Sequence, residues 1–383
     1  MAAIQVTPVS GKADLAEFIR LPKRLYRGLK GYIPPLDMER TEALTPKTNP
    51  YFDHAEVQLF LARRDGKVVG RVSAQIDALH QEKYADKTGH FGFLDAEDDP
   101  AIFAALIDTA EAWLKQRGMV RAVGPVSFTT NEEIGVLVEG FDSRPMLLMP
   151  FHPPYNAPHI ERRGYAKVKD VIAYNLDKND YKPLASQRML DRAMKEGGVT
   201  VRTLDTKRFK EEVTTVIEIF NDAWADNWGM VPFTEKEMAA AAKGLKDLID
   251  PKMVVIAEQG GEAAGMMICL PNLLEAARDI DGKLFPFGFA KLLYRLKFNT
   301  VRSGRIPLMG IRRKHHGTVL GATLLPLMFE RLRVRFLERG MQSLEMSWIL
   351  EDNMAMRRVL EGLGGKAYKK HRIYEKSLGS PGG

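Results

Sequence analysis

The chain has 383 residues, of which 45% are hydrophobic, 27% charged and 9% aromatic, so it carries ample apolar material for a folded core. This composition excludes disordered and fibrous proteins. Because a single hydrophobic core stops growing at roughly 250–300 residues, we expect about two domains. The one cysteine, Cys269, excludes an internal disulfide and a cysteine-based metal site.

The 56 basic and 49 acidic residues give a net charge of +7, which indicates a partner only where the excess is local. No stretch approaches the roughly 18 apolar residues of a membrane span, and Met1–Arg20 lacks the apolar run of a signal peptide. The sequence therefore predicts a cytoplasmic protein, and a peripheral position on the inner membrane face stays open.

Residues 59–72 have the pattern of two apolar strands joined by a tight turn, and the same pattern returns at 254–267. The shared positions are Ala62, Gly66 and Gly70 in the first copy and Ala257, Gly261 and Gly265 in the second. A glycine in each turn supplies the positive φ that a tight hairpin needs. This similarity indicates an internal repeat, which is the first feature to establish because it sets the whole fold.

The two copies remain alike beyond the hairpin. Leu114–Met119 and Leu337–Met341 each end a helix at a glycine, and Gly164 with Tyr174 corresponds to Gly364 with Tyr374. Each half is predicted to contain a hairpin, a strand, an amphipathic helix, a strand, a short helix and a final strand. The expected boundaries are 1–177 for the N-terminal domain, 178–198 for a linker helix, 199–377 for the C-terminal domain and 378–383 for a flexible tail.

An insertion with no counterpart in the first copy, Pro271–Arg305, holds the local excess of charge. It contains six bases and no acid from residue 283 onward, namely Lys283, Lys291, Arg295, Lys297, Arg302 and Arg305. Phenylalanines and leucines are interleaved with these bases, a composition typical of an interfacial helix on anionic lipid. The alternative is a lid that packs on the protein's own core.

A strand, a loop and a helix follow the insertion and form an α/β unit. The pattern predicts a strand at Ile306–Ile311, a helix at Val319–Arg339 and a second strand at Ser343–Leu350. The loop between the first strand and the helix is rich in glycine and bases. The histidines of the chain lack metal-ligand spacing, so no metal site is expected.

This unit resembles the GNAT N-acetyltransferases, and the chain resembles a tandem of two such domains. In that family the loop has the pattern Gln/Arg-x-x-Gly-x-Gly/Ala and holds the pyrophosphate of acyl-CoA at a helix N-terminus. His316, Val319 and Gly321 take the three motif positions, and only Gly321 fits strictly. A second family pattern appears at Asn353–Gly365, where Leu360 replaces the usual tyrosine acid.

The resemblance implies an α/β fold of two tandem GNAT-like domains, each with a mixed, mostly antiparallel twisted sheet flanked by helices. It also implies acyl-CoA or CoA as co-substrate and no metal. The implied cofactor-binding residues are Met309, Gly310, Ile311, Arg312, Arg313, His316, Gly317, Thr318, Val319, Leu320, Gly321 and Asn353. The first copy has Asp95, Glu97, Asp98 and Asp99 in place of the loop. Because these acids repel a pyrophosphate, one cofactor site per chain is expected.

Two segments rich in glycine, proline and polar residues, Thr129–Tyr155 and Asn221–Pro232, resemble a bacterial subgroup associated with ceramide synthase-type N-acylation. The implied substrate-binding residues are Asn131, Tyr155, Trp224, Asn227 and Trp228. The alternative interpretation places the tryptophans in the core and makes Asn131 and Glu133 part of a turn.

The resulting hypothesis is an acyltransferase that uses acyl-CoA or acyl carrier protein to N-acylate a long-chain or amphipathic amine, such as a sphingoid base. Glu133 is the expected base, with His315 or His316 as alternatives. An anionic membrane surface is the expected further partner, nucleic acid is not expected, and the oligomeric state stays undetermined. Two other functions remain open at this point: an aminoacyl-tRNA-dependent transferase and a non-catalytic membrane-docking module.

Overall fold

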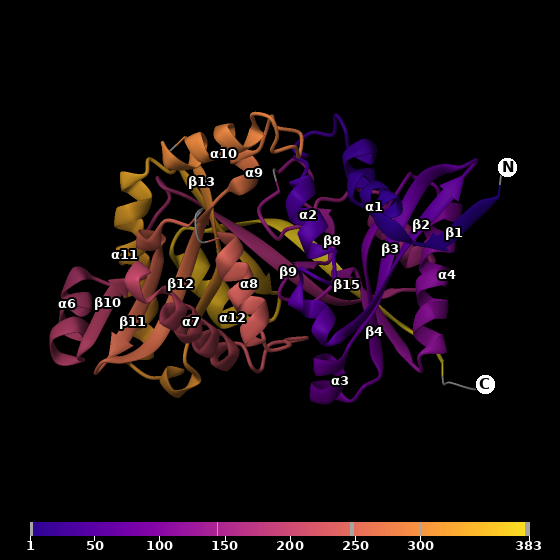
Figure 1. Cartoon of the computed structure of the whole chain (residues 1–383). Helices are drawn as coiled ribbons and strands as arrows, with labels where there is room; N and C mark the ends of the chain where they lie inside the picture. Colours follow the sequence, from indigo (N-terminus) through magenta and orange to yellow (C-terminus); the bar gives the residue numbers. More distant parts are fainter. Residues whose placement is uncertain (1–2, 144, 246–248, 299, 380–383) are drawn as a thin grey trace. The chain divides into compact units, whose positions relative to one another are not determined.

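The computed structural model describes residues 3–143, 145–245, 249–298 and 300–379 (Figure 1). The chain divides into two compact units. Unit 1 comprises residues 1–171, 277–288 and 369–383, and unit 2 comprises residues 172–276 and 289–368. No helix within the described residues is long and apolar enough to cross a membrane.

Unit 1 is built on a mixed, mostly antiparallel sheet in the order β1-β2-β3-β4-β5-β15. These strands are β1 (Ile4–Pro8), β2 (Ala55–Arg64), β3 (Lys67–Asp77), β4 (Thr88–Ala96), β5 (Arg121–Gly124) and β15 (Lys366–Ser377). Strands β4 and β5 are parallel, and β8 (Val136–Glu139) pairs with β15. A separate pair is formed by β6 (Val126–Ser127) and β7 (Glu133–Ile134). The helices are α1 (Gly11–Leu25), α2 (Asp37–Ala43), α3 (Ala78–Tyr84), α4 (Pro100–Gln116) and α5 (Asn156–Arg162).

Helices cover both faces of this sheet, as the alternation of side chains along β2 predicts. Leu59 and Leu61 pack in one cluster with Phe18 of α1. The intervening Phe60 and Ala62 pack in another cluster with residues of α4. One strand therefore supplies both layers of the core.

Unit 2 is built on strands that follow the order β9-β14-β13-β12-β11-β10. Its strands are β9 (Ala166–Asp177), β10 (Val199–Thr203), β11 (Val254–Gln259), β12 (Glu262–Pro271), β13 (Ser303–Ile311) and β14 (Ser343–Leu350). Its helices are α6 (Gln187–Glu196), α7 (Phe209–Ala223), α8 (Glu235–Leu245), α9 (Leu273–Ala276), α10 (Gly288–Lys297), α11 (Gly321–Glu338) and α12 (Met354–Gly362).

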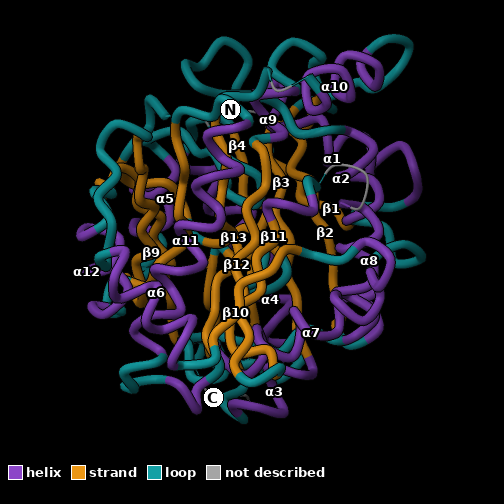
Figure 2. Tube along the Cα trace, turned by 90° about the vertical axis from the view of Figure 1, so that its left-hand side faces the viewer, coloured by secondary structure: helices purple, strands orange, loops and turns teal. Residues whose placement is uncertain are grey.

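Helices α7 and α11 lie on opposite faces of the unit 2 sheet, and strands β11–β13 lie between them in Figure 2. Along β12, Met266 packs with residues of α7, whereas Met267 and Cys269 pack with residues of α11 and α12. The lone cysteine is thus a buried core residue, and burial raises the pKa of its thiol.

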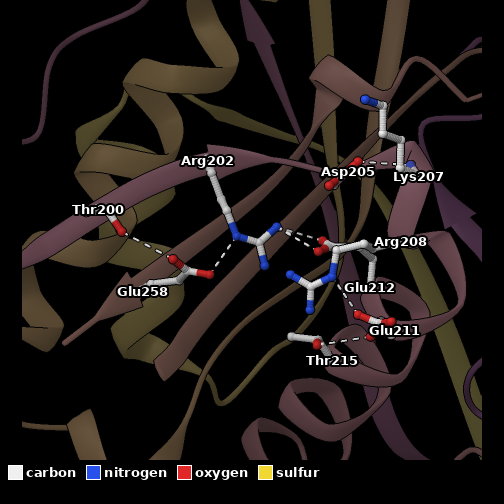
Figure 3. Close-up of polar contacts among 9 residues, drawn as sticks. All are labelled: Thr200, Arg202, Asp205, Lys207, Arg208, Glu211, Glu212, Thr215 and Glu258. Atoms are coloured by element: carbon white, nitrogen blue, oxygen red, sulfur yellow. Dashed lines mark hydrogen bonds and ion pairs between the residues drawn. The ribbon is translucent and has the colours of Figure 1, made fainter. Parts of the chain in front are cut away.

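A polar cluster around the buried Glu212 ties α7 to the edge of this sheet (Figure 3). Arg202 of β10 donates from Nε to Glu258 of β11 at 2.6 Å and from Nη1 to both carboxylate oxygens of Glu212 on α7, at 2.9 and 2.7 Å. Glu212 is 2% exposed, so its carboxylate charge has lost contact with water and is stabilised by this guanidinium instead. Arg202 therefore holds two strands and a helix together.

The backbone register confirms the internal repeat. In the first hairpin Ala62 pairs with Gly70, and in the second Ala257 pairs with Gly265. The register of both hairpins then shifts at the following residue. The repeat also extends further toward the N-terminus than the sequence pattern indicated, because β1 pairs with β2 as β10 pairs with β11.

The two units do not follow the order of the repeats along the chain. Residues 172–177 of β9 belong to unit 2, although β9 closes the first repeat, and residues 369–377 of β15 belong to unit 1. The predicted linker 178–198 contains α6, which packs on α11 and β10 within unit 2. In the predicted tail 378–383, Leu378 is buried and donates its N–H to Val120, and residues from 380 onward lie outside the described residues.

Candidate functional site

Strands β13 and β14 separate midway along their length. They pair in parallel from Ser303 and Ser343 to Ile306 and Met346, yet both strands continue for several residues. Pro307 follows the last paired residue and has no N–H to donate to a neighbouring strand. A gap therefore opens between the strands beyond this point.

A pocket of about 620 Å³ occupies this gap, within the range of small-molecule sites. Beyond the two strands, it is lined by the end of α7, the loop from β13 to α11, the first turn of α11 and the helix α12. Most of its lining is apolar and includes Met309, Met346, Trp348, Met356 and Val359. Such a surface suits a ligand with a long apolar portion.

Two backbone amides of β13 point into the gap. Arg312 donates its N–H to Ala264 of β12 at 2.8 Å, so the alternation of amides along a strand turns those of Met309 and Ile311 away from β12. Their carbonyls confirm this orientation. That of Met309 accepts from Trp224 Nε1 at 3.1 Å, and that of Ile311 lies 2.8 Å from His316 Nε2. The pocket is thus provided with N–H donors for a carbonyl oxygen.

The loop from β13 to α11 bends tightly around Gly321. A Cβ at this position would overlap the carbonyl oxygen of His315, so only glycine fits. The Gly321 N–H donates to Thr318 Oγ1 at 2.9 Å. Across the described part of the chain, the N–H groups of Gly317, Val319 and Leu320 have no protein acceptor. Free amides at the start of an 18-residue helix form a site that favours an anion.

The basic side chains of the loop are engaged elsewhere. Arg312 pairs with Glu218 at 3.0 Å, and Lys314 pairs with Glu262 at 2.6 Å. Arg313 pairs with Asp222 and Asp226. None of the three bases is among the residues that line the pocket. Arg312 and Arg313, which the resemblance implied as cofactor-binding residues, are thus held by acids of α7 and the turn after it, and Lys314 is held by an acid of β12.

The two candidate histidines line the pocket from this loop. His315 is buried, and its Nε2 has no hydrogen-bond partner among the described residues. Burial lowers the pKa of His315 below its ordinary value, and the charge of Lys314 lowers it further. His315 is therefore neutral at pH 7 and able to accept a proton. His316 is more exposed and contacts the Ile311 carbonyl.

Two tryptophans meet on the α7 side of the pocket. Trp224 follows α7, and its ring contacts that of Trp348 edge to face, with 5.4 Å between centroids. Asn227 also lines the pocket and donates its N–H to the Trp224 carbonyl at 2.9 Å. Trp228, predicted to bind substrate, is not among the lining residues.

The remaining predicted cofactor residues have different environments. Asn353 lines the pocket and caps α12, where its Oδ1 accepts from the Met356 N–H at 3.1 Å. Val319 is 88% exposed and Leu320 packs against the core. Leu360, in the place of the usual tyrosine, is fully buried and brings no hydroxyl to the pocket.

The predicted residues of the polar segment 129–155 lie in unit 1. Glu133 lies in β7, and its carboxylate pairs with Arg40 of α2. Asn131 donates its backbone N–H to Thr129 Oγ1, and Tyr155 donates its hydroxyl to the Ala96 carbonyl at 2.9 Å. The side chains of Glu133 and Tyr155 are thus held by unit 1 itself, and the Glu133 carboxylate is already occupied by a guanidinium.

Among the described residues of the first repeat, no equivalent gap separates the strands. Strands β4 and β5 pair only to His90 and Val123, after which residues 124–127 cross back over β4. A Cβ on Gly92 would overlap the Val126 carbonyl, and Phe93 donates its N–H to Ser127 Oγ at 3.1 Å.

An acid occupies the position in the first repeat that corresponds to Gly310. Asp95 is buried against Arg71 and Tyr26, whereas Asp99 caps α4 by accepting from the Ala101 N–H. Both carboxylates are also paired with arginines, Asp95 with Arg71 and Asp99 with Arg64. The expectation that the first copy repels an anion stays a prediction.

Sequence reasoning missed several residues that build the site. Pro307, Met346, Ser347 and Trp348 line the pocket, yet the predicted strands gave no reason to select them. Only Pro307, a proline inside a strand pattern, carried a usable signal. No cluster of residues suited to a metal ion occurs in the described ranges.

Comparison with known proteins agrees with this geometry, although no protein-family model matches the chain. The chain is 50% identical over 378 residues to a bacterial ceramide synthase of Caulobacter vibrioides (strain NA1000 / CB15N), covering 98% of each chain. It is 45% identical over 369 residues to Protein YghO of Escherichia coli (strain K12), covering 96% of this chain and 94% of that protein.

Solved structures support the fold. A tandem GNAT protein from the clavulanic acid biosynthesis pathway matches with a TM-score of 0.59 at 15% identity, covering 98% of this chain and 99% of that one. A GCN5-related N-acetyltransferase from Sphaerobacter thermophilus matches with a TM-score of 0.54 at 14% identity, covering 98% and 96%. The predicted tandem GNAT fold and acyltransferase class are confirmed. The chain belongs to the family of the bacterial ceramide synthase and is an acyltransferase with two tandem GNAT-like domains.

Proposed function

We propose that this protein transfers an acyl group from acyl-CoA to the amine of a long-chain base, in the manner that the name of its Caulobacter relative indicates for that protein. The observation that carries the proposal is the pocket between β13 and β14, which joins free amides at the N-terminus of α11 to a long apolar interior. An acyl thioester with an anionic end and an apolar end matches both parts.

The anionic end of the donor would bind at the loop before α11. The amides of Gly317, Val319 and Leu320 supply donors there, and the α11 dipole favours negative charge. Arg312 and Arg313 are paired with acids, so backbone groups rather than loop side chains carry this recognition. Asn353 lines the same pocket from α12.

The thioester carbonyl would be polarised by the amides of Met309 and Ile311, which point into the gap. Donors fixed in a strand need no rearrangement when negative charge develops on the oxygen. The amine must be neutral to attack the carbonyl carbon. Its nitrogen then forms the new bond, the carbon–sulfur bond breaks, and the proton from nitrogen is finally taken up by the thiolate.

His315 is the better candidate for the base that receives this proton. It lines the pocket, is neutral at pH 7, and has a ring nitrogen without a partner in the described part of the chain. Glu133 is the alternative base, but its carboxylate is already paired with Arg40 of α2. His316 contacts a backbone carbonyl and is the less suitable histidine.

We further propose that α10 and the residues before it bind an anionic membrane surface. Phe289, Tyr294 and Phe298 are 50%, 59% and 60% exposed, and Phe285 and Phe287 are 77% and 73% exposed. Exposed aromatic rings beside basic residues favour the interface of an anionic bilayer. A lid packed on the core would instead bury these rings.

The count of six bases overstates the charge available to lipid. Arg295 donates to the Ala276 carbonyl, Arg302 donates to the Gly340 carbonyl, and Arg305 is buried against Ser347. The exposed bases of the segment are Lys283, Lys291, Lys297 and Arg302, and of these Arg302 is held by its bond to Gly340. Each base near an anionic leaflet contributes about 1 kcal/mol, so the electrostatic attraction is roughly half of what six available bases would give.

The experiment that tests the function combines the purified protein with a sphingoid base and one of three donors: acyl-CoA, acyl-loaded acyl carrier protein or aminoacyl-tRNA. Mass spectrometry of the products should show an N-acylated base with acyl-CoA. Transfer from aminoacyl-tRNA alone would contradict the proposal, as would a complete lack of transfer from all three donors. Transfer only from acyl carrier protein would keep the N-acylation and overturn the choice of donor.

A further inference from the structure

The pocket passes through the sheet of unit 2 rather than lying on one face of it. Helices α11 and α12 pack on one face, and α7 packs on the opposite face. Residues of all three helices or of their ends line the pocket, including Leu325, Val359 and Ala223. Because β13 and β14 separate beyond Ile306 and Met346, the gap between them connects the two faces.

The direction of a bound donor follows from this geometry. The free amides lie at the start of α11, so the anionic end of the donor belongs on the α11 side. The amides of Met309 and Ile311 lie in the gap itself, where the thioester carbonyl would sit. The acyl chain, attached to that carbonyl, must therefore extend toward the α7 side.

The two tryptophans line the α7 side of the pocket. The indole of Trp224 is fixed by its hydrogen bond to the Met309 carbonyl and by contact with Phe220, at 4.8 Å between ring centroids. Phe220 in turn contacts Phe233. Trp348 is 8% exposed and meets Trp224 edge to face. Trp224 is thus held by a hydrogen bond and by Phe220, and Trp348 packs against it, so the two rings form a wall.

We infer that Trp224 and Trp348 form the end of the acyl-chain site and set the longest acyl group that the enzyme binds in full. This inference rests on the proposed use of acyl-CoA and deepens it. Each methylene that leaves water for an apolar site raises affinity about fourfold. Affinity should therefore rise with chain length until the chain reaches the two rings, and then level off.

The test measures the affinity of CoA and of acyl-CoA thioesters of increasing chain length by calorimetry, together with kcat/KM for the same series. Replacing Trp348→Ala removes one ring of the wall. The length at which affinity levels off should move to longer chains. The affinity for those longer chains should rise about fourfold for each methylene newly buried. Affinity for CoA itself should stay within about twofold, because the CoA end lies on the other side of the sheet.

Two further variants keep the test interpretable if Trp348→Ala folds poorly. Trp348→Leu keeps an apolar side chain in the core and should move the limit by less. Trp224→Phe keeps a ring but loses the hydrogen bond to Met309, so the wall should become looser. Trp228→Ala is the matched control, because Trp228 belongs to the same turn and does not line the pocket.

The possible results separate the two proposals. If the wild type binds CoA and the limiting chain length is the same in wild type, Trp348→Leu and Trp224→Phe, the tryptophans do not end the acyl site and the inference is wrong. If Trp228→Ala moves the limit as far as the other variants, the inference is also wrong. If the wild type binds neither CoA nor any acyl-CoA, the proposed donor is wrong and the inference falls with it.

Discussion

Arg305 of β13 donates from Nε to Ser347 Oγ of β14 at 2.9 Å, directly beyond the point where these two parallel strands stop pairing. Arg305 also donates from Nη2 to the Ser347 carbonyl at 3.2 Å. Ser347 and Tyr368 both donate to the fully buried Glu345. This cluster fixes the strand that forms one wall of the pocket. In the first repeat His90 and Val123 take the places of Arg305 and Glu345, and the chain that follows Val123 crosses back over β4.

Removing the guanidinium of Arg305 should lower the free energy of unfolding substantially. Arg305→Met would remove the guanidinium that lies 3.7 Å from the buried Glu345 carboxylate, and breaking a buried ion pair on one side costs about 3–5 kcal/mol in the free energy of unfolding. Ser347→Ala, which keeps both charges, should cost only about 1 kcal/mol. Denaturant unfolding of both variants checks this. Equal stability of Arg305→Met and wild type would show that the cluster does not hold the strands.

Gly321 should be essential for binding of CoA. Gly321→Ala places a methyl group against the His315 carbonyl and forces the loop to move, which displaces the free amides. We expect CoA affinity to fall at least about tenfold, or ~1.4 kcal/mol, as measured by calorimetry. Val319→Ala is the control, because Val319 is 88% exposed and its amide is retained. Similar affinities of the two variants would mean that the α11 N-terminus does not hold the donor.

The pH dependence of turnover should report His315. Burial lowers the pKa of His315 below its ordinary value of roughly 6.5. A base with a lowered pKa stays deprotonated into mildly acidic solution, so kcat/KM should stay level on the acid side until the pH falls below about 6.5. His315→Gln should remove this limb of the profile and lower kcat, whereas His316→Gln should retain it.

The same shift affects stability. The folded protein keeps His315 neutral where the unfolded chain is already protonated, so the unfolded state binds more protons. The contribution is fully present above the unfolded pKa and is lost as the pH falls from there toward the folded pKa. The acid-induced loss of unfolding free energy should therefore be smaller in His315→Gln than in wild type. An identical loss in both proteins would contradict the assigned shift.

Binding to anionic vesicles should depend on α10. Lys291→Glu with Lys297→Glu reverses two exposed charges and should reduce co-sedimentation with anionic vesicles, with little effect on neutral ones. Arg295 is left in place because it supports the Ala276 carbonyl. Acylation of a vesicle-borne amine should slow while that of a short soluble amine stays unchanged. Arg192→Glu with Lys195→Glu on α6 is the control, because it changes the net charge by the same amount. An equal loss of vesicle binding in the control would show that net charge, and not α10, determines binding.

Two arginines of Figure 3 allow a matched test of burial. Arg202→Met leaves the buried Glu212 without its guanidinium and should lower the free energy of unfolding by about 3 kcal/mol or more. Arg208→Met removes an exposed pair with Glu211 and should lower the free energy of unfolding far less, because exposed ion pairs contribute little. Thermal or denaturant unfolding compares them directly. A larger cost for the Arg208 variant would overturn the role assigned to Arg202.

The sequence by itself determined the repeat, the hairpins, the strand–loop–helix unit and the place of Gly321. Each of these is a local property. Glycines at turns, alternating apolar residues in strands and helical periodicity are visible within a short window of sequence, and Gly66 and Gly261 both have the positive φ that their turns require.

The tertiary structure alone decided how the pocket is built. The gap depends on strands β13 and β14 ceasing to pair, and its wall depends on Trp224 and Trp348, which are far apart in sequence. The bases of the loop are paired with acids that come from α7, the turn after it and β12. The assignment of the last parts of β9 and β15 to the two units likewise rests on strand pairing. Long-range contacts of this kind leave no periodic signal in the chain, because their energy comes from residues that only folding brings together.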